Sequence, residues 1–243
     1  MPPRILVTRP EPAATVTAGR LREAGYEPVV LPLSRVMPLI VSTMTADEAR
    51  GCAAVAVSSA NAIRHAPPRL IAALTGKPCF AIGAHSAKVA RIAGFDLVRI
   101  SGGDGEDLAR LVGEGTPDGA VVAYLCGRVR KATVERDIAS SGRSVIPVET
   151  YDAHPIDYSP AELAHMVGNG RIDAVLLYSD RAALSFATLT SSGNASARFA
   201  DIPLLGLSAG IGEALPGRCF TAASEPNEEA LFAVLGRVVA ATP

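Results

Sequence analysis

The sequence has few of the features of a nucleic-acid-binding protein. It contains no tryptophan, and aromatic residues make up only 5% of it, so side chains on which bases could stack are scarce. Its 23 Lys and Arg residues are balanced by 24 Asp and Glu residues, whereas nucleic-acid-binding domains usually carry an excess of positive charge. We therefore expect no nucleic-acid partner, and we expect any anionic ligand to be bound by local cations and backbone amides.

The motifs of the common metal and nucleotide sites are also missing. The cysteines form neither a CxxC pair nor a ligand-spaced group with the four histidines, which argues against a zinc site. The sequence has no spaced acidic set for magnesium, no GxxxxGK[ST] run and no GxGxxG after an apolar strand, so the usual phosphate-binding loops are not predicted. The cysteines are Cys52, Cys79, Cys126 and Cys219.

Long apolar segments are absent as well. No run reaches the ~18 apolar residues of a membrane-spanning helix, and the first residues do not resemble a secretory leader. Hydrophobic residues make up 49% of the chain and charged residues 19%, a balance typical of a folded core. We expect a cytoplasmic protein with no membrane partner.

Short apolar runs alternate with segments of helical pattern along the whole chain. This alternation is typical of βαβ units and parallel sheets. Ten strands exceed the average of about 5–6 per sheet, so we predict two α/β domains, each with a doubly wound, parallel, five-stranded sheet. The predicted strands are 5–7, 29–31, 53–57, 79–82, 97–100, 120–125, 144–148, 173–178, 202–206 and 219–222.

An internal repeat supports the division into two domains. Three blocks recur in the same order at a nearly constant offset, so that Ser59 matches Ser179, Gly83 matches Gly206 and Leu108 matches Leu231. The second copy lacks two strands, which we expect residues 4–7 and 29–31 to supply. The prediction is a discontinuous domain of residues 1–33 and 156–243, an inserted domain of 38–147, and linker strands at 34–37 and 148–155.

Small polar residues and glycine follow several of the predicted strands. Ligands of parallel α/β sheets bind at the carboxyl ends of the strands, and a cleft between two domains is the usual site. Ser, Thr and Asn there can simply cap helices, but helix N-termini also bind anions through backbone amides. The candidate substrate-binding residues are Thr8, Ser58, Ser59, Asn61, Gly83, Ser86, Ser179 and Ser208, together with the strand-end cations Arg9, Arg128 and Arg130.

The run Gly206-Leu207-Ser208-Ala209-Gly210 matches the nucleophile elbow of α/β hydrolases. In that fold the catalytic histidine follows the serine along the chain, and here no histidine comes after His165. The repeated copy at 83–87 also lacks the second glycine. We therefore favour a strand-to-helix turn over a hydrolase site.

Tyr151 and His154 lie in the second predicted linker. A tyrosine there can be a packing residue. If it faces a cleft, its phenol can donate a proton to a leaving group. His154 could do the same, although Pro155 favours a turn, and the residues alone do not decide between them.

Taken together, these segments resemble the uroporphyrinogen-III synthase family along essentially the whole chain. No single segment is specific, but their order and spacing are. The segments are LVTRP (6–10), SSANA (58–62), AIG (81–83) with SA (86–87), LCGR (125–128), VETY (148–151), LYS (177–179), LG (205–206) and ASEP (223–226).

The resemblance implies two flavodoxin-like domains joined by a two-stranded linker, with the first domain discontinuous. It implies a cyclising hydro-lyase of porphyrin biosynthesis that converts the linear tetrapyrrole hydroxymethylbilane to uroporphyrinogen III, with loss of water and inversion of ring D. It further implies no cofactor or metal, a monomer, and functional coupling to hydroxymethylbilane synthase.

Single residues carry over from the family as well. Tyr151 matches the family's linker tyrosine, which is proposed to assist the departure of the substrate hydroxyl. Ser86 matches a position that is usually threonine in the family. Residues 207–209 depart from the family's Pro-Thr-Thr-like run, which weakens the assignment of Ser208. The alternative function is a non-catalytic two-domain sensor of a small anion, or a regulatory synthase-like module; the retained Tyr151 argues against it.

Overall fold

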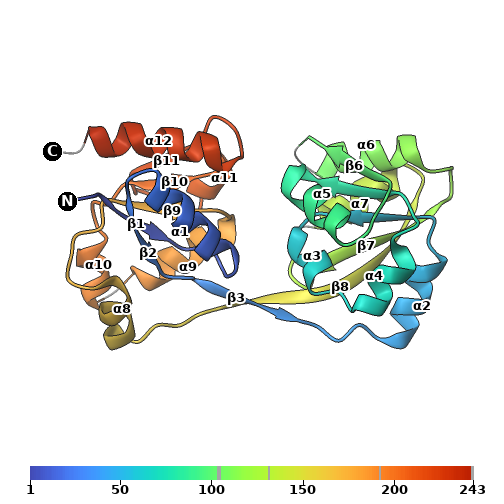
Figure 1. Ribbon diagram of the computed structural model, residues 1–243, viewed down its shortest axis with the longest axis horizontal. Coiled ribbons are helices and arrows are strands. Elements are labelled where there is room, and N and C mark those ends of the chain that lie inside the picture. Colours follow the sequence, from blue (N-terminus) through green and yellow to red (C-terminus); the bar gives the residue numbers. More distant parts are fainter. Residues whose placement is uncertain (103–104, 131, 192, 242–243) are drawn as a thin grey trace. The chain divides into compact units, whose positions relative to one another are not determined.

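The chain folds into two compact units. The computed structural model describes residues 1–102, 105–130, 132–191 and 193–241. Unit 1 consists of Met1–Arg35 and His154–Pro243, and unit 2 of Val36–Ala153. In Figure 1 the first strands of the chain, in blue, share unit 1 with the orange and red C-terminal elements, while the green elements make up most of unit 2. The chain ends are therefore part of the same unit.

Unit 1 is built on a five-stranded parallel sheet in the order β11-β10-β9-β1-β2. Its strands are β1 (Arg4–Val7), β2 (Glu27–Val30), β9 (Ala174–Leu177), β10 (Leu204–Gly206) and β11 (Phe220–Ala222). Its helices are α1 (Ala13–Glu23), α8 (Pro160–Val167), α9 (Asp180–Leu189), α10 (Gly193–Arg198), α11 (Ala209–Gly212) and α12 (Glu228–Ala240).

Unit 2 is built on a six-stranded sheet in the order β3-β8-β7-β4-β5-β6. The strands of this sheet are β3 (Ser34–Pro38), β4 (Ala54–Val57), β5 (Cys79–Ile82), β6 (Val98–Ser101), β7 (Val121–Gly127) and β8 (Ser144–Pro155). The first two residues of β3 and the last two of β8 belong to unit 1. The helices of unit 2 are α2 (Thr43–Gly51), α3 (Ala60–Arg64), α4 (Pro68–Leu74), α5 (Gly83–Ile92), α6 (Gly105–Gly115) and α7 (Thr133–Ser140).

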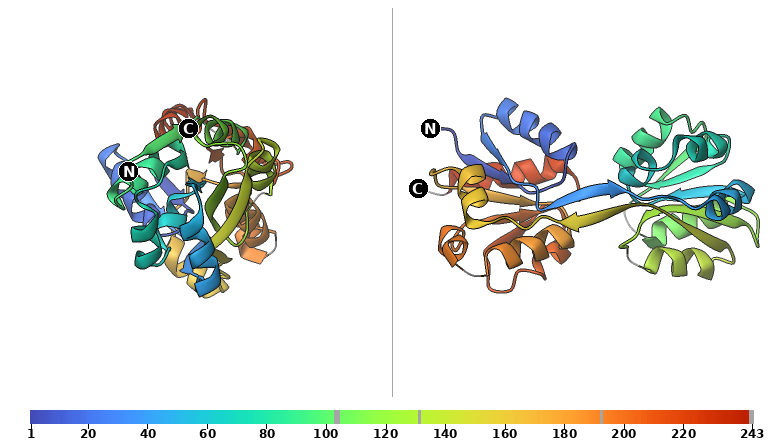
Figure 2. Two further views of the ribbon diagram at one scale, coloured as in Figure 1. Left: turned by 90° about the vertical axis from the view of Figure 1, so that its right-hand side faces the viewer. Right: turned by 90° about the horizontal axis from the view of Figure 1, so that it is seen from below.

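Helices cover both faces of each sheet (Figure 2), and each face buries its own apolar cluster. In a strand, successive side chains point to opposite faces. Accordingly, Ile5 and Val7 of β1 pack with residues of α1 and α12, whereas Leu6 between them packs with residues of α8 and α9. In unit 2 the β4 residues Val55 and Val57 lie in the cluster that includes residues of α3 and α4, and the alanines of β4 face α6 and α7. Burial on both faces explains why these strands are apolar throughout.

The predicted α/β class with parallel sheets is confirmed, but five strands per sheet is wrong for unit 2. The extra strand is β3, which joins the edge of the sheet beside β8. The amide of Leu39 donates to the Thr150 carbonyl at 2.9 Å, and that of Ile156 donates to the Leu33 carbonyl at 3.1 Å. As residue numbers rise along β3 they fall along β8, so this pair is antiparallel. Residues 148–151, expected in a linker strand, pair with β7 as part of the long strand β8.

The two units share one spatial order of strands. If β9, β10 and β11 are matched with β4, β5 and β6, as the sequence repeat requires, then β1 and β2 take the places of β7 and β8. Numbered along the chain, the order is 2-1-3-4-5 in unit 1 and 3-2-1-4-5 for the parallel strands of unit 2. The units are therefore circular permutations of one arrangement. Within the described part of the chain, no helix has the length and apolar character needed to cross a membrane.

Candidate functional site

The predicted site residues follow the carboxyl ends of neighbouring strands, except Tyr151, which lies within a strand beside the carboxyl end of its neighbour. In unit 1 they follow β1, β9 and β10, which are adjacent in the sheet. In unit 2 they follow β4, β5 and β7 or lie in β8, which are also adjacent. Each unit therefore presents one polar edge, at the place where ligands of parallel α/β sheets bind.

The polar residues after β4 are partly engaged in structural contacts. The Ser58 hydroxyl lies 2.6 Å from the Tyr124 hydroxyl, and burial raises the pKa of Tyr124 to about 12, so this phenol keeps its proton. Ser59 caps α3 by accepting a hydrogen bond from the amide of Asn61 at 3.2 Å. The Asn61 side-chain oxygen accepts from Arg64 at 3.4 Å. The expected capping role is therefore confirmed for Ser59.

The segment after β5 starts a helix with a glycine. Gly83 is the first residue of α5 and has a φ of 74°, a conformation that side chains with a Cβ rarely adopt. The glycine is therefore needed for the strand to turn directly into the helix. Ser86 lies in the first turn and is buried, with 6% of its surface exposed.

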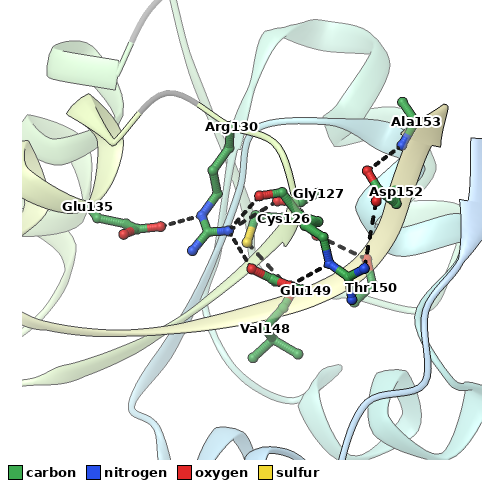
Figure 3. Close-up of polar contacts among 10 residues, drawn as sticks. Cys126, Gly127, Arg130, Glu135, Val148, Glu149, Thr150, Asp152 and Ala153 are labelled. Carbon is green, nitrogen blue, oxygen red and sulfur yellow. Dashed lines mark hydrogen bonds and ion pairs between the residues drawn. The ribbon is translucent and has the colours of Figure 1, made fainter. Parts of the chain in front are cut away.

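The cations after β7 are already paired with carboxylates (Figure 3). Arg130 donates to Glu149 at 2.8 Å and also binds Glu135. Arg128 contacts Glu149 at 3.4 Å and Asp152 at 3.7 Å, but 56% of its side chain is exposed. The two arginines thus flank Glu149, and Arg128 is the more accessible of the two to a ligand.

The charge of Arg130 is secured by its partners. Burial lowers the pKa of its guanidinium, but the hydrogen bonds to Glu135 and Glu149 outweigh burial and raise the pKa above its usual value. Arg130 also donates to the backbone carbonyls of Gly127 and Arg128, at 3.3 and 3.1 Å. It therefore holds the loop after β7 in place as well as carrying a positive charge.

Tyr151 lies in β8 beside the end of β7 and packs against the apolar cluster on the α3 side of the sheet. Its ring is partly exposed and lies 6.2 Å from that of His65, between centroids. Burial, helped by the positive charge of Arg64, lowers the pKa of His65. An imidazole and a phenol are therefore neighbours at this edge.

In unit 1, two of the predicted residues are used by the fold itself. The buried Thr8 hydroxyl donates to the Leu176 carbonyl at 2.7 Å. Ser179 caps α9 by accepting from the amide of Ala182 at 3.2 Å, so its predicted capping role is confirmed. Ser208 precedes α11 but makes no capping hydrogen bond, and it is exposed. Of the three hydroxyls, that of Ser208 is therefore the one not used by the fold as a buried donor or a helix cap.

Arg9 is held by a carboxylate that the sequence analysis did not single out. Its guanidinium lies 3.2 Å from Glu228 and 4.2 Å from the ring centroid of Tyr178. Glu228 also accepts from Thr17 at 2.5 Å and from Tyr178 at 2.7 Å, and it binds Arg20. We call these five residues the Glu228 cluster. They join β1, α1, β9 and α12 at the carboxyl edge of the unit 1 sheet.

The acidic partners of the predicted cations were missed because they follow no motif. The one feature of the sequence that could have pointed to Glu149 is its position near Tyr151 in the VETY segment. Glu228 had only its position just after Asn227, the residue that caps α12. In the described part of the chain, no group of three or more His, Cys, Asp or Glu side chains could hold a metal ion.

A family model described as uroporphyrinogen-III synthase HemD matches residues 15–233. No curated protein matches the chain. Among solved structures, a uroporphyrinogen-III synthetase from Helicobacter pylori aligns with 98% of this chain and 100% of its own at a TM-score of 0.66 and 15% identity.

A mutant uroporphyrinogen III synthase from Thermus thermophilus aligns with 98% of this chain and 99% of its own, at a TM-score of 0.61 and 15% identity. At this identity the structures show a common fold alone. The family model, which spans most of the sequence, supports the activity of a uroporphyrinogen-III synthase over that of a non-catalytic sensor. The chain belongs to the uroporphyrinogen-III synthase family.

Proposed function

We propose that this chain converts hydroxymethylbilane to uroporphyrinogen III as a cyclising hydro-lyase. The observation that carries the proposal is the family match over residues 15–233. We also propose that the two compact units are flavodoxin-like domains. The strand order 2-1-3-4-5 of unit 1 is that of flavodoxin, and unit 2 has the same spatial order in permuted form.

The reaction needs an acid at the departing hydroxyl. When the terminal hydroxyl of hydroxymethylbilane accepts a proton and leaves as water, the chain becomes a conjugated azafulvene cation. Ring D then attacks this cation through a spiro intermediate, which inverts the ring before the macrocycle closes. We assign proton donation to the phenol of Tyr151, which is partly exposed at the carboxyl edge of the unit 2 sheet.

The remaining work is positioning, since the azafulvene is reactive by itself. Eight substrate carboxylates require donors, and we propose that the partly exposed Arg128, the hydroxyl of Ser208 and the helix N-termini at the strand ends supply part of them. Arg9 and Arg130 are paired with Glu228 and with Glu149 and Glu135. Their contribution to binding is therefore indirect: through these ion pairs they hold the polar edge of each sheet in a fixed arrangement.

The family resemblance implies that no cofactor or metal takes part. We propose accordingly that the side chains and backbone of this chain suffice, that it acts as a monomer, and that it receives its unstable substrate from hydroxymethylbilane synthase. Ser59, Asn61 and Ser179 serve the substrate indirectly, by fixing the first turns of α3 and α9.

The test is the rate at which hydroxymethylbilane is consumed, measured above its spontaneous closure. Replacing Tyr151 with Phe removes only the phenolic oxygen, and loss of a general acid costs about 10²- to 10⁴-fold in rate. We expect a loss in that range with the unfolding midpoint unchanged. Wild-type kinetics in Tyr151→Phe would remove this residue from the proton-donating role, while an inactive wild-type protein would refute the function itself.

A further inference from the structure

The strand that carries Tyr151 contains a β-bulge at the end of β7. The β7 and β8 partners run in step up to Cys126 and Glu149, but Gly127 then pairs with Tyr151. Thr150 is thus the extra residue. A bulge of this kind bends a strand and changes the direction in which the next side chain points. Here the next side chain is that of Tyr151.

The bulged residue is anchored on both sides. Thr150 is fully buried, and its hydroxyl donates to the Ala62 carbonyl at 2.8 Å. The same hydroxyl lies 3.4 Å from the Cys126 carbonyl (Figure 3). Its own carbonyl accepts from the amide of Leu39 at 2.9 Å. The bulge is therefore tied to α3, to β7 and to the segment after β3, so its geometry is fixed by three neighbours.

Gly127 makes room for the tyrosine ring. A Cβ at Gly127 would lie 2.8 Å from Cζ of Tyr151, 3.0 Å from Cε2 and 3.1 Å from the hydroxyl oxygen, closer than carbon atoms approach without repulsion. The backbone of Gly127 does not have the positive φ that would itself call for glycine. The tyrosine is therefore the reason for glycine at this position.

Neighbours on several sides thus fix the position of the Tyr151 ring. The Gly127 backbone lies under the hydroxyl end of the ring, and the amide of Arg128 donates to the Tyr151 carbonyl at 2.9 Å. The ring of His65 lies 6.2 Å away at an interplanar angle of 40°. A side chain held in this way can present its hydroxyl in one direction.

We propose that Gly127 and Thr150 are positioning residues that aim the phenol of Tyr151 at the departing hydroxyl of the substrate. The proposal rests on the proposed function and on the role of Tyr151 in it. Gly127 sets the place of the ring, and the bulge at Thr150 sets the direction from which the side chain leaves the strand. Neither residue needs to touch the substrate.

The first test is Gly127→Ala. Because the added methyl displaces the ring, and a misplacement of about 1 Å can cost about 10²-fold in rate, we expect kcat to fall about 10²-fold while KM changes less than about twofold. The matched control is Gly51→Ala at the end of α2, where a Cβ meets no atom within 4 Å, and this variant should keep wild-type kinetics.

The decisive readout is the dependence on Tyr151. In a Tyr151→Phe background, Gly127→Ala should have little further effect on kcat, since the hydroxyl that it displaces is already gone. If Gly127→Ala lowers kcat by the same factor in both backgrounds, it acts independently of the phenol and the proposal is wrong. Unchanged kcat in Gly127→Ala alone would also overturn it.

Thr150 gives a second test that does not depend on the folding of Gly127→Ala. Thr150→Val keeps the branched shape but loses the hydrogen bond to Ala62, whereas Thr150→Ser keeps that hydroxyl. We expect Thr150→Val to lower kcat at least about tenfold and Thr150→Ser to restore most of it, again only when Tyr151 is present. Equal kcat in the two variants would contradict the role of the bulge. If the wild type itself were inactive, the proposed function would fail, not this inference alone.

Discussion

Glu228 should contribute more to the stability of unit 1 than any surface carboxylate. It lies in the first turn of α12, 13% of its side chain is exposed, and it accepts hydrogen bonds from Thr17 at 2.5 Å and Tyr178 at 2.7 Å. It also binds Arg9 at 3.2 Å and contacts Arg20. Replacing Glu228 with Gln keeps the size of the side chain but removes the charge that all four donors share.

The size of the effect follows from these contacts. A hydrogen bond to a charged group contributes about 1.5–3 kcal/mol, and two hydroxyls donate to this carboxylate. The Gln carbonyl keeps part of that energy. The pair with Arg20, whose side chain is 45% exposed, adds little because solvent screens it. We therefore expect Glu228→Gln to lower the free energy of unfolding by about 2–4 kcal/mol at pH 7.

The effect should depend on pH in one direction. Burial raises the pKa of Glu228, but the hydrogen bonds from Thr17 and Tyr178 and the charges of Arg9 and Arg20 outweigh burial, so the pKa in the folded protein is lowered. The contribution of the carboxylate is therefore fully present above the ordinary glutamate pKa of about 4.3. It is lost as the pH falls through the lower folded value. The stability difference between wild type and Glu228→Gln should shrink between about pH 5 and pH 3.

Urea unfolding at a series of pH values measures both quantities. The matched control is Glu229→Gln, because Glu229 is exposed in the same first turn of α12 and meets the same helix dipole. We expect that variant to stay within about 0.5 kcal/mol of wild type. A Glu228→Gln variant as stable as Glu229→Gln, or a stability difference that grows in acid, would refute the structural role given to Glu228.

Two further predictions concern Arg143 and the four cysteines. Arg143 donates to the carbonyls of Gly113 at 2.7 Å and Thr116 at 2.6 Å, so Arg143→Met should lower the free energy of unfolding by about 2–4 kcal/mol by leaving them unpaired; urea unfolding with no such loss would contradict this. Cys219 is the one exposed thiol among the four cysteines, so a thiol reagent at pH 8 should modify one site rapidly in the native protein and none in Cys219→Ser. The three buried cysteines should react only on unfolding. Burial raises the pKa of Cys79 and Cys126 to about 12 and also raises that of Cys52. Rapid modification of a buried cysteine in the native protein would contradict this prediction.

Local patterns in the sequence predicted the local structure well. The apolar run at 53–57 became β4, buried on both faces, because a parallel strand between two helical layers has no polar side. Ser59 and Ser179 were expected to cap helices and do so, since the hydroxyl needs only an amide two or three residues ahead.

Contacts between distant parts of the chain could not be predicted from the sequence. Arg9 and Glu228 are separated by 219 positions, and no spacing rule links them. Gly83 and Gly206 match in the repeat for different reasons. Gly83 requires a positive φ, whereas a Cβ at Gly206 would lie 2.7 Å from the ring of Phe220. Strands were expected at 34–37 and 148–155, but not their place in the six-stranded sheet of unit 2, because a linker strand carries no pattern that shows which sheet it joins.

The ring isomer of the product tests the proposed function most directly. The purified protein is supplied with hydroxymethylbilane as it is formed, and the cyclised products are separated and quantified. Closure without inversion of ring D gives the type I isomer, as the spontaneous reaction does. We predict that the wild-type protein shifts the product to type III and that Tyr151→Phe shifts it much less at equal protein concentration. A product ratio equal to that of the spontaneous reaction would contradict the assignment of this chain as a uroporphyrinogen-III synthase.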